Sequence, residues 1–166
     1  MWLDSDGEKG KCADLSGANL TCVDLSGADL RLANLRHTNL SDADLTHANL
    51  TNAYLIYADL TRANLTHANL SGVDLSDADL AGANLSGADL YGANLTGAYL
   101  YNANLTDANL THANLTCVDL TDANLTHANL TDADLTGTYL TYADLTDTIL
   151  DEKEQCRKGI VLTEPM

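Results

Sequence analysis

Leucine occupies every fifth position from Leu15 to Leu150 without an exception, and this period constrains the fold more than any other feature. Two residues before each Leu stands a small side chain, which is Ala in most units and Val or Thr in the others. Asp or Asn lies between the two, except in four units with a larger residue: Tyr54, Tyr99, Tyr139 and Ile149. The chain is therefore a series of A-(D/N)-L-x-x units, and such a fixed internal period is typical of repeat architectures.

A five-residue period suits neither an α-helix nor a straight β-strand. On a helix, successive leucines would step by roughly 140° and scatter around the cylinder. On a straight strand, an odd step would place Leu15 and Leu20 on opposite faces. All of the leucines can share one core only if the chain turns once in every unit and closes into stacked coils. The sequence therefore predicts a solenoid with Leu and the small residue inside and the other three positions outside.

The two variable positions of each unit contain residues that suit a turn. Thr or Ser follows Leu in most units, and the next residue is often Gly, Asp, Asn or His. These residue types tolerate turns or hydrogen-bond to their own backbone. Pro is absent from residues 13–150, so no backbone N–H is lost from the ladder between coils. We therefore expect the bend of each unit at its last two residues.

With these residues the chain resembles the pentapeptide-repeat proteins, above all the regular Leu-centred members from cyanobacteria. Residues 13–150 match the pattern with no insertion or skipped register. The resemblance implies an all-β fold, a right-handed quadrilateral parallel β-helix with four units to a coil and about seven coils. At an inter-strand spacing of ~4.8 Å, such a body would be about 34 Å long. One leucine column of the expected core comprises Leu15, Leu35, Leu55, Leu75, Leu95, Leu115 and Leu135.

The two ends differ from the repeat in composition. Residues 1–12 and 151–166 contain the only Trp, the only Pro and every Lys. We expect them to form an N-terminal and a C-terminal cap, because a β-helix exposes open backbone edges at its ends. Trp2 and Leu3 are the candidate N-terminal cover, and residues 151–158 have the composition of a short helix.

The charge of the chain is strongly acidic and unevenly distributed. The formal net charge is −16, and no Lys or Arg occurs between Arg62 and Lys153. This composition disfavours binding to a phosphate backbone and to an anionic membrane. Asn interrupts most columns of pre-leucine Asp, and stacked amides can form hydrogen-bonded ladders. No stretch approaches the ~18 apolar residues of a transmembrane helix, and the first residues do not resemble a signal peptide.

The four cysteines do not suggest a disulfide framework. No two of them are twenty residues apart, the separation of stacked neighbours in a four-unit coil: Cys12, Cys22, Cys117 and Cys156. Free thiols indicate a reducing compartment. We therefore expect a bacterial, cytoplasmic protein, with the periplasm or the thylakoid lumen as the alternative if the chain is processed or excised.

No catalytic, cofactor or metal site emerges from the pattern. Ser, His and Asp occur as interchangeable residues of the variable positions, and no Gly-rich phosphate loop is present. His47 and His67 form the only stacked histidine pair, whereas a structural zinc site needs four ligands and a catalytic site three. The sequence predicts a protein that is not an enzyme and holds no cofactor.

Tyrosine is the one unevenly distributed surface residue. Four tyrosines of the C-terminal half are predicted to gather around one corner as a partner-binding edge: Tyr99, Tyr101, Tyr139 and Tyr142. Exposed aromatic side chains supply contact area at low entropic cost. The alternative is that these tyrosines only replace Asp or Asn in the ladders. We predict a structural scaffold or protein-interaction module without direct nucleic-acid binding, which is a monomer or a weak end-to-end dimer.

The resemblance also implies an alternative function, that of a DNA mimic. Some pentapeptide-repeat proteins resemble B-DNA in shape and charge and bind DNA gyrase, which they protect from quinolones or inhibit. This chain shares the acidic rod. It departs from those members because it has no Phe at the centre of its units, no loop that breaks the coils and no long apolar C-terminal segment.

Overall fold

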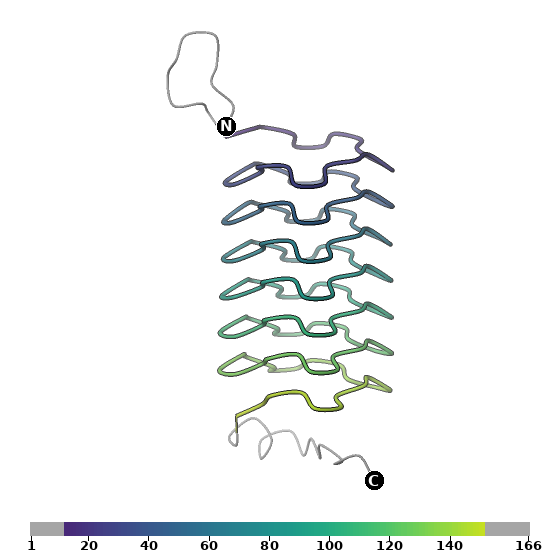
Figure 1. Ribbon diagram of the computed structural model, residues 1–166, viewed down its shortest axis with the longest axis vertical. Coiled ribbons are helices and arrows are strands. Elements are labelled where there is room, and N and C mark those ends of the chain that lie inside the picture. The colour runs from purple at the N-terminus through teal and green to yellow at the C-terminus, as the bar shows by residue number, and fades with distance from the viewer. Residues whose placement is uncertain (1–11, 152–166) are drawn as a thin grey trace.

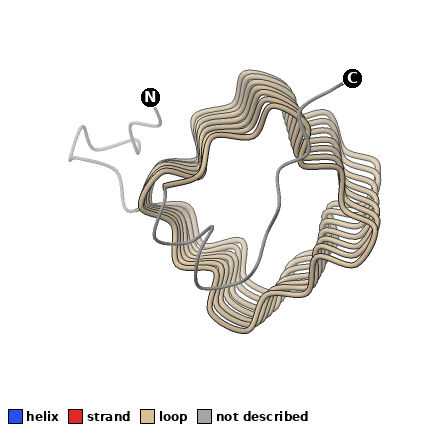
Figure 2. Ribbon diagram, turned by 90° about the horizontal axis from the view of Figure 1, so that it is seen from below, coloured by secondary structure: helices blue, strands red, loops and turns tan. Residues whose placement is uncertain are grey.

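Residues 12–151, which the computed structural model describes, form a stack of coils seen from the side in Figure 1 and along its axis in Figure 2. These residues include no helix, and their strand pairing consists of isolated single-residue bridges. The pre-leucine residue of each unit forms a parallel bridge with the residue twenty positions later, from Asp14 with Asn34 to Asn129 with Ile149. Four units therefore separate stacked neighbours, and the predicted all-β quadrilateral helix is confirmed.

Three backbone hydrogen bonds in each unit of the inner coils join neighbouring coils. The Leu N–H donates to a carbonyl of the next coil, as Leu85 does to Asn104 over 2.7 Å. The N–H of the second variable residue does the same, as Gly87 does to Thr106 over 2.8 Å. The pre-leucine N–H donates to the previous coil, as Asn84 does to Ala63 over 2.9 Å. The backbone polar groups that lie between coils are thus satisfied on all four sides.

Each unit turns at its two variable residues, as the sequence predicts. The N–H of the small residue donates to the Leu carbonyl three residues earlier, as Ala88 does to Leu85 over 3.0 Å. The second variable residue has a positive φ in every unit from Gly17 to Asp147, which is the type II turn pattern. Only eight of these residues are Gly. Most units therefore contain a left-handed L-residue, at a cost of about 1–2 kcal/mol each.

The core is a stack of leucine layers and small-residue layers. Every repeat Leu from Leu35 to Leu135 is at most 1% exposed, and the small residues between them are at most 3% exposed. Of the expected core column, the six leucines from Leu35 onward are buried. Leu15 is only partly buried because it lies in the first described coil, which a described coil covers on one side only.

Three units place Thr rather than Ala or Val inside, and each of these hydroxyls has an acceptor. The Thr Oγ1 donates to a Leu carbonyl of the preceding coil at 2.9–3.0 Å; the pairs are Thr38 with Leu15, Thr138 with Leu115, and Thr148 with Leu125. A buried hydroxyl without an acceptor would destabilise the core. The coil register thus supplies the partner that lets Thr take the place of a small apolar residue.

The predicted terminal caps lie outside the described residues. Trp2 and Leu3 belong to residues 1–11, and the expected C-terminal helix falls almost entirely within residues 152–166. Within the described part of the chain, no helix is long and apolar enough to cross a membrane.

We expect Leu85→Asp to lower the free energy of unfolding by more than about 4 kcal/mol, because it places an unpaired charge in a closed core. Leu85 is fully buried in a middle coil. Ser86→Ala, one residue later on the outside, is the matched control and should cost less than about 1 kcal/mol. Urea unfolding followed by circular dichroism measures both. Similar losses for the two variants would contradict the inward position of the leucines.

Candidate functional site

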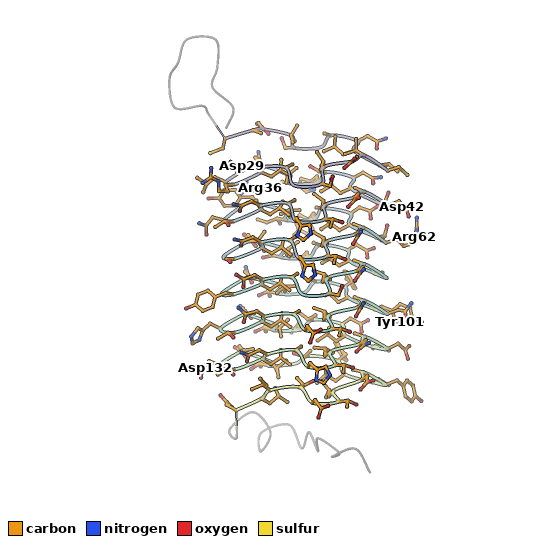
Figure 3. All side chains as sticks on the ribbon, viewed as in Figure 1. Asp29, Arg36, Asp42, Arg62, Tyr101 and Asp132 are labelled. Carbon is orange, nitrogen blue, oxygen red and sulfur yellow. The ribbon has the colours of Figure 1, made fainter. Side chains whose placement is uncertain are left out.

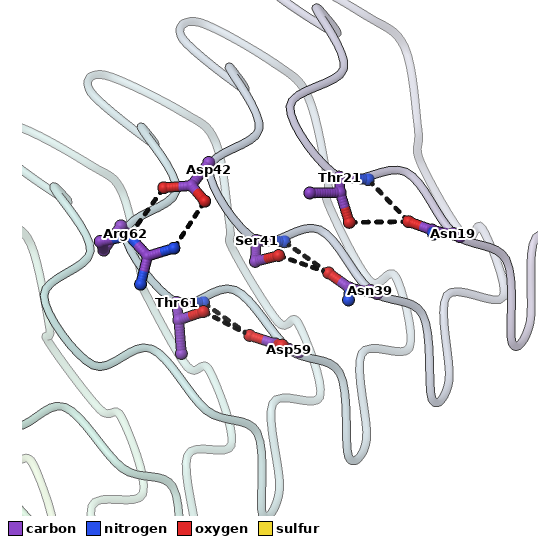
Figure 4. Close-up of polar contacts among 8 residues, drawn as sticks. All are labelled: Asn19, Thr21, Asn39, Ser41, Asp42, Asp59, Thr61 and Arg62. Atoms are coloured by element: carbon purple, nitrogen blue, oxygen red, sulfur yellow. Dashed lines mark hydrogen bonds and ion pairs between the residues drawn. The ribbon is translucent and has the colours of Figure 1, made fainter.

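The Asp or Asn before each Leu holds the turn of its own unit. In the close-up of Figure 4, Asn19 Oδ1 accepts hydrogen bonds from the Thr21 N–H at 3.1 Å and the Thr21 hydroxyl at 2.7 Å. The next two coils repeat this pair of bonds, in Asn39 with Ser41 and in Asp59 with Thr61. This link between the two positions was not predicted from the sequence. The recurrence of Ser or Thr two residues after Asp or Asn is the signal for such a turn.

At four of the Asp acceptors, hydrogen bonds from the residue two positions later favour the charged carboxylate: Asp14, Asp24, Asp29 and Asp144. The hydroxyl and N–H of Thr146 hold the pKa of Asp144 below its ordinary value. Hydrogen bonds from Arg31 lower the pKa of Asp29 further, to about 2. Ser16 and Ser26 have the weaker effect on Asp14 and Asp24, whose pKa values are also lowered. These carboxylates therefore stay ionised in mildly acidic solution.

Some of the Asn side chains that stand before Leu connect neighbouring coils. Asn104 Nδ2 donates to Asn84 Oδ1 over 3.2 Å, and Asn109 Nδ2 donates to Asp89 Oδ1 over 2.8 Å. Such bonds are the ladders that the sequence predicts. They give the walls a polar, largely self-satisfied surface.

Four tyrosines break this polar pattern on one wall and its edge, and we call them the tyrosine wall: Tyr99, Tyr101, Tyr139 and Tyr142. Tyr99 and Tyr139 stand before Leu on the wall itself, and parallel bridges place Asp119 between them. Tyr101 and Tyr142 lie on the adjacent turn, where Figure 3 labels Tyr101. All four are exposed, from 49% for Tyr101 to 85% for Tyr142. The structure therefore brings together the four residues that the sequence singles out.

The tyrosine wall differs from the other described tyrosines in its lack of stacking partners. The other three rings contact a side chain of a neighbouring coil: Arg36 lies 4.3 Å above Tyr54, His37 stacks on Tyr57 at 5.2 Å, and His112 meets Tyr91 edge-on at 5.4 Å. Within residues 12–151, no ring stacking or cation–π contact involves a tyrosine of the wall. Among the described residues, these four rings are therefore exposed and unstacked.

Two tyrosine-containing units have lost both partners of the side-chain turn bond. Where Tyr54 and Tyr99 replace Asp or Asn, the residue after Leu is also apolar, namely Ile56 and Tyr101. The backbone ladder continues regardless, since the Tyr99 N–H still donates to Ala78 over 2.9 Å. These tyrosines therefore do not hold their own turns, and their presence is not explained by the fold.

The stacked histidines form a ring contact. His47 and His67 lie one above the other, with ring centroids 5.4 Å apart and planes inclined by 13°. Across residues 12–151, no three His, Cys, Asp or Glu side chains form a group that could hold a metal ion. The described cysteines are exposed free thiols: Cys12, Cys22 and Cys117. Cys156 lies outside the described residues.

Comparison with known proteins identifies the family of the chain. A family model for pentapeptide repeats (8 copies) matches residues 11–36, 43–82, 58–97, 93–132 and 119–152. The chain belongs to the pentapeptide-repeat family. Its coils are accordingly those of a right-handed quadrilateral β-helix, which confirms the predicted fold class.

Solved pentapeptide-repeat structures are similar to this protein. HetL, involved in heterocyst differentiation regulation in the cyanobacterium Nostoc sp. strain PCC 7120, is 39% identical over 86% of this chain and 74% of HetL, with a TM-score of 0.47. A pentapeptide repeat protein from the Arabidopsis thaliana thylakoid lumen is 35% identical over 64% of this chain and 71% of its own, with a TM-score of 0.39. QnrB1, a plasmid-mediated fluoroquinolone resistance protein, is 19% identical over 89% of both chains, with a TM-score of 0.40. A comparison with curated proteins found no match.

Gly87 and Gly92 distinguish the cost of backbone strain from the cost of a steric clash at the left-handed turn position. Both have a positive φ, but a Cβ on Gly87 would clash with the His67 imidazole, whereas nothing lies within 4 Å of a Cβ on Gly92. We expect Gly92→Ala to destabilise by about 1 kcal/mol from backbone strain alone. Gly87→Ala should cost more and should displace the His67 ring. Urea unfolding and the NMR shifts of His67 test this, and equal losses with unchanged shifts would refute it.

Proposed function

We propose that this pentapeptide-repeat protein is a non-catalytic scaffold that binds another protein through the tyrosine wall. The observation behind the proposal is the exposure of Tyr99, Tyr101, Tyr139 and Tyr142 without stacking partners in the described part of the chain. Aromatic side chains are enriched among the residues that dominate binding energy in protein interfaces. A tyrosine buries about 150–250 Å² when it is fully covered. Four of them on one side therefore supply a substantial contact surface.

The rigidity of the wall supports a binding function. The backbone around Tyr99 is hydrogen-bonded to both neighbouring coils, and the Tyr139 N–H donates to Val118 of the preceding coil over 2.9 Å. A partner that docks here would not have to order a loop, so little conformational entropy is lost on binding.

As candidates for acid–base catalysis, the described surface has only His–Asp pairs on exposed turns, such as His112 with Asp132 at 3.7 Å. Catalysis depends on groups that converge in a concave site, and these pairs stand on convex turns.

We expect the double variant Tyr99→Ala with Tyr142→Ala to lose its partner, because it removes two of the four rings of the tyrosine wall. Affinity capture with the full chain as bait, followed by mass spectrometry, identifies the proteins that depend on these rings. Their affinity should fall by about tenfold or more. Tyr54→Ala with Tyr57→Ala, which removes two rings elsewhere, is the matched control. A protein retained equally by both double variants would contradict binding through the tyrosine wall.

A DNA-mimic function is the second candidate, and one observation favours it. Residues 63–151 contain twelve Asp and no Glu, Lys or Arg, so this part of the rod has an uncompensated negative charge. Against it, Asn separates most of the stacked pre-leucine carboxylates, and turn hydroxyls occupy others, as Thr146 does for Asp144. The charge therefore lacks the regular spacing of a phosphate backbone.

We expect no inhibition of DNA gyrase supercoiling by the intact protein at micromolar concentration. A mimic must present phosphate-like charge to a basic groove, so its affinity would fall steeply with added salt. A supercoiling assay across a salt series measures this. Potent inhibition that disappears at high salt would favour the acidic surface over the tyrosine wall.

A further inference from the structure

We infer that the tyrosine wall binds a basic, extended segment of a protein partner, with arginine or lysine side chains seated on the rings of Tyr99 and Tyr139. This inference rests on the proposed function and names the chemistry of the partner. Acidic and aromatic residues alternate in the column that contains Tyr99 and Tyr139. Parallel bridges order this column as Asp79, Tyr99, Asp119 and Tyr139.

The chain itself contains one cation that lies over the ring of a pre-leucine tyrosine. The Arg36 guanidinium lies 4.3 Å from the ring centroid of Tyr54, which stands before Leu in the next coil. Arg36 is the first variable residue of its unit and precedes Tyr54 by eighteen positions. The β-helix therefore places a side chain at that position over the face of a pre-leucine tyrosine, where a cation is attracted by the ring electrons.

On the tyrosine wall the corresponding positions are occupied by small side chains. Eighteen residues before Tyr99 stands Ala81, and eighteen residues before Tyr139 stands Thr121. Ala81 is the only Ala at this position of the repeat, where Thr and Ser predominate. Neither Ala81 nor Thr121 can place a cation over Tyr99 or Tyr139 as Arg36 does over Tyr54. Because Ala81 is so small, it leaves the face of the Tyr99 ring especially open.

The carboxylates of Asp79 and Asp119 in this column can accept further hydrogen bonds. Asp79 and Asp119 each accept one hydrogen bond, from the N–H two residues later, at 3.0 Å. Asp59, in the same column, also accepts the Thr61 hydroxyl at 2.7 Å. Within residues 12–151, neither Asp79 nor Asp119 has such a side-chain donor. Each can therefore pair with a cation that sits on an adjacent ring.

No basic side chain of the described chain competes for this surface. Residues 63–151 have no Lys or Arg, and the arginines nearer the N-terminus are engaged locally. Arg31 pairs with Asp29 at 2.7 Å, and Arg62 pairs with Asp42 at 2.6 Å, as Figure 4 shows for the latter. Among residues 12–151, no Lys or Arg therefore compensates the negative potential around the tyrosine wall, and this potential attracts a cationic segment.

The spacing of the rings favours an extended segment with a basic residue at every third position. Tyr99 and Tyr139 are two coils apart, which is about 9.6 Å at the usual spacing of parallel strands. A polyproline II segment rises about 3.1 Å per residue and brings every third side chain to the same face, about 9.3 Å apart. Two such cations would lie over Tyr99 and Tyr139 with Asp119 between them.

The test uses a fluorescent synthetic peptide with Arg at every third position among Gly and Pro, and the same peptide with Glu in place of Arg. Fluorescence anisotropy with the full chain should show salt-sensitive binding of the Arg peptide only. Tyr99→Leu with Tyr139→Leu should weaken binding by about tenfold, because Leu keeps apolar area but has no ring electrons. Tyr99→Phe with Tyr139→Phe should bind within about twofold of the original chain.

Charge is tested by a matched pair of substitutions. Asp119→Asn, between the two rings, should weaken Arg-peptide binding severalfold. Asp132→Asn removes the same charge on the opposite side of the rod from Tyr101, as Figure 3 shows, and should leave binding unchanged. Circular dichroism melting of each variant verifies that the coils are intact.

The outcomes separate this inference from the proposed function. Equal binding of the two peptides, or Leu variants that bind as well as the Phe variants, would overturn the basic-segment inference. If partner capture still depends on Tyr99 and Tyr142 in that case, the scaffold function stands without it. Capture that is indifferent to these tyrosines would overturn the proposed function and the inference with it.

Discussion

A turn with a positive φ in every five-residue unit is the constraint on which the whole structure depends. It lets the chain change direction four times in twenty residues, so that each pre-leucine residue pairs with the residue twenty positions later. That pairing aligns Leu above Leu and Ala above Ala, and the aligned layers exclude water. The strain of the left-handed residues is offset by ladders and burial that would not exist without the turn.

The inner and outer positions of the unit have separate tasks, and this separation is what makes the walls adaptable. The ladder uses backbone atoms, and the core uses Leu and a small residue, so neither depends on the pre-leucine side chain. Asn19 and Asp59 stabilise their turns through Oδ1, yet Tyr99 occupies the same position with the ladder intact. A wall can therefore gain aromatic residues at a modest loss of local stability.

The period of five was sufficient to predict the coil, the inward leucines and the turn positions, because each follows from which side chains must share a core. The gathering of the four tyrosines followed from the twenty-residue register, which the resemblance to pentapeptide-repeat proteins implied. The side-chain bonds across each turn were missed, since periodicity places residues on faces but does not give the reach of a side chain within its own unit. The contact of Arg36 with Tyr54 was missed for a related reason. It depends on how a side chain leans toward the next coil, which only coordinates reveal.

Negative charge and exposed aromatic rings together make this surface more selective than either feature alone. An acidic rod without aromatic residues would attract any basic partner with little selectivity, since exposed charges are screened over about 8–10 Å. Exposed tyrosines alone would offer apolar area to many partners. Their alternation in Asp79, Tyr99, Asp119 and Tyr139 demands cations at a defined spacing, which neither feature demands alone. Since the repeat fixes that spacing to the distance between coils, the stiffness of the β-helix becomes the source of selectivity.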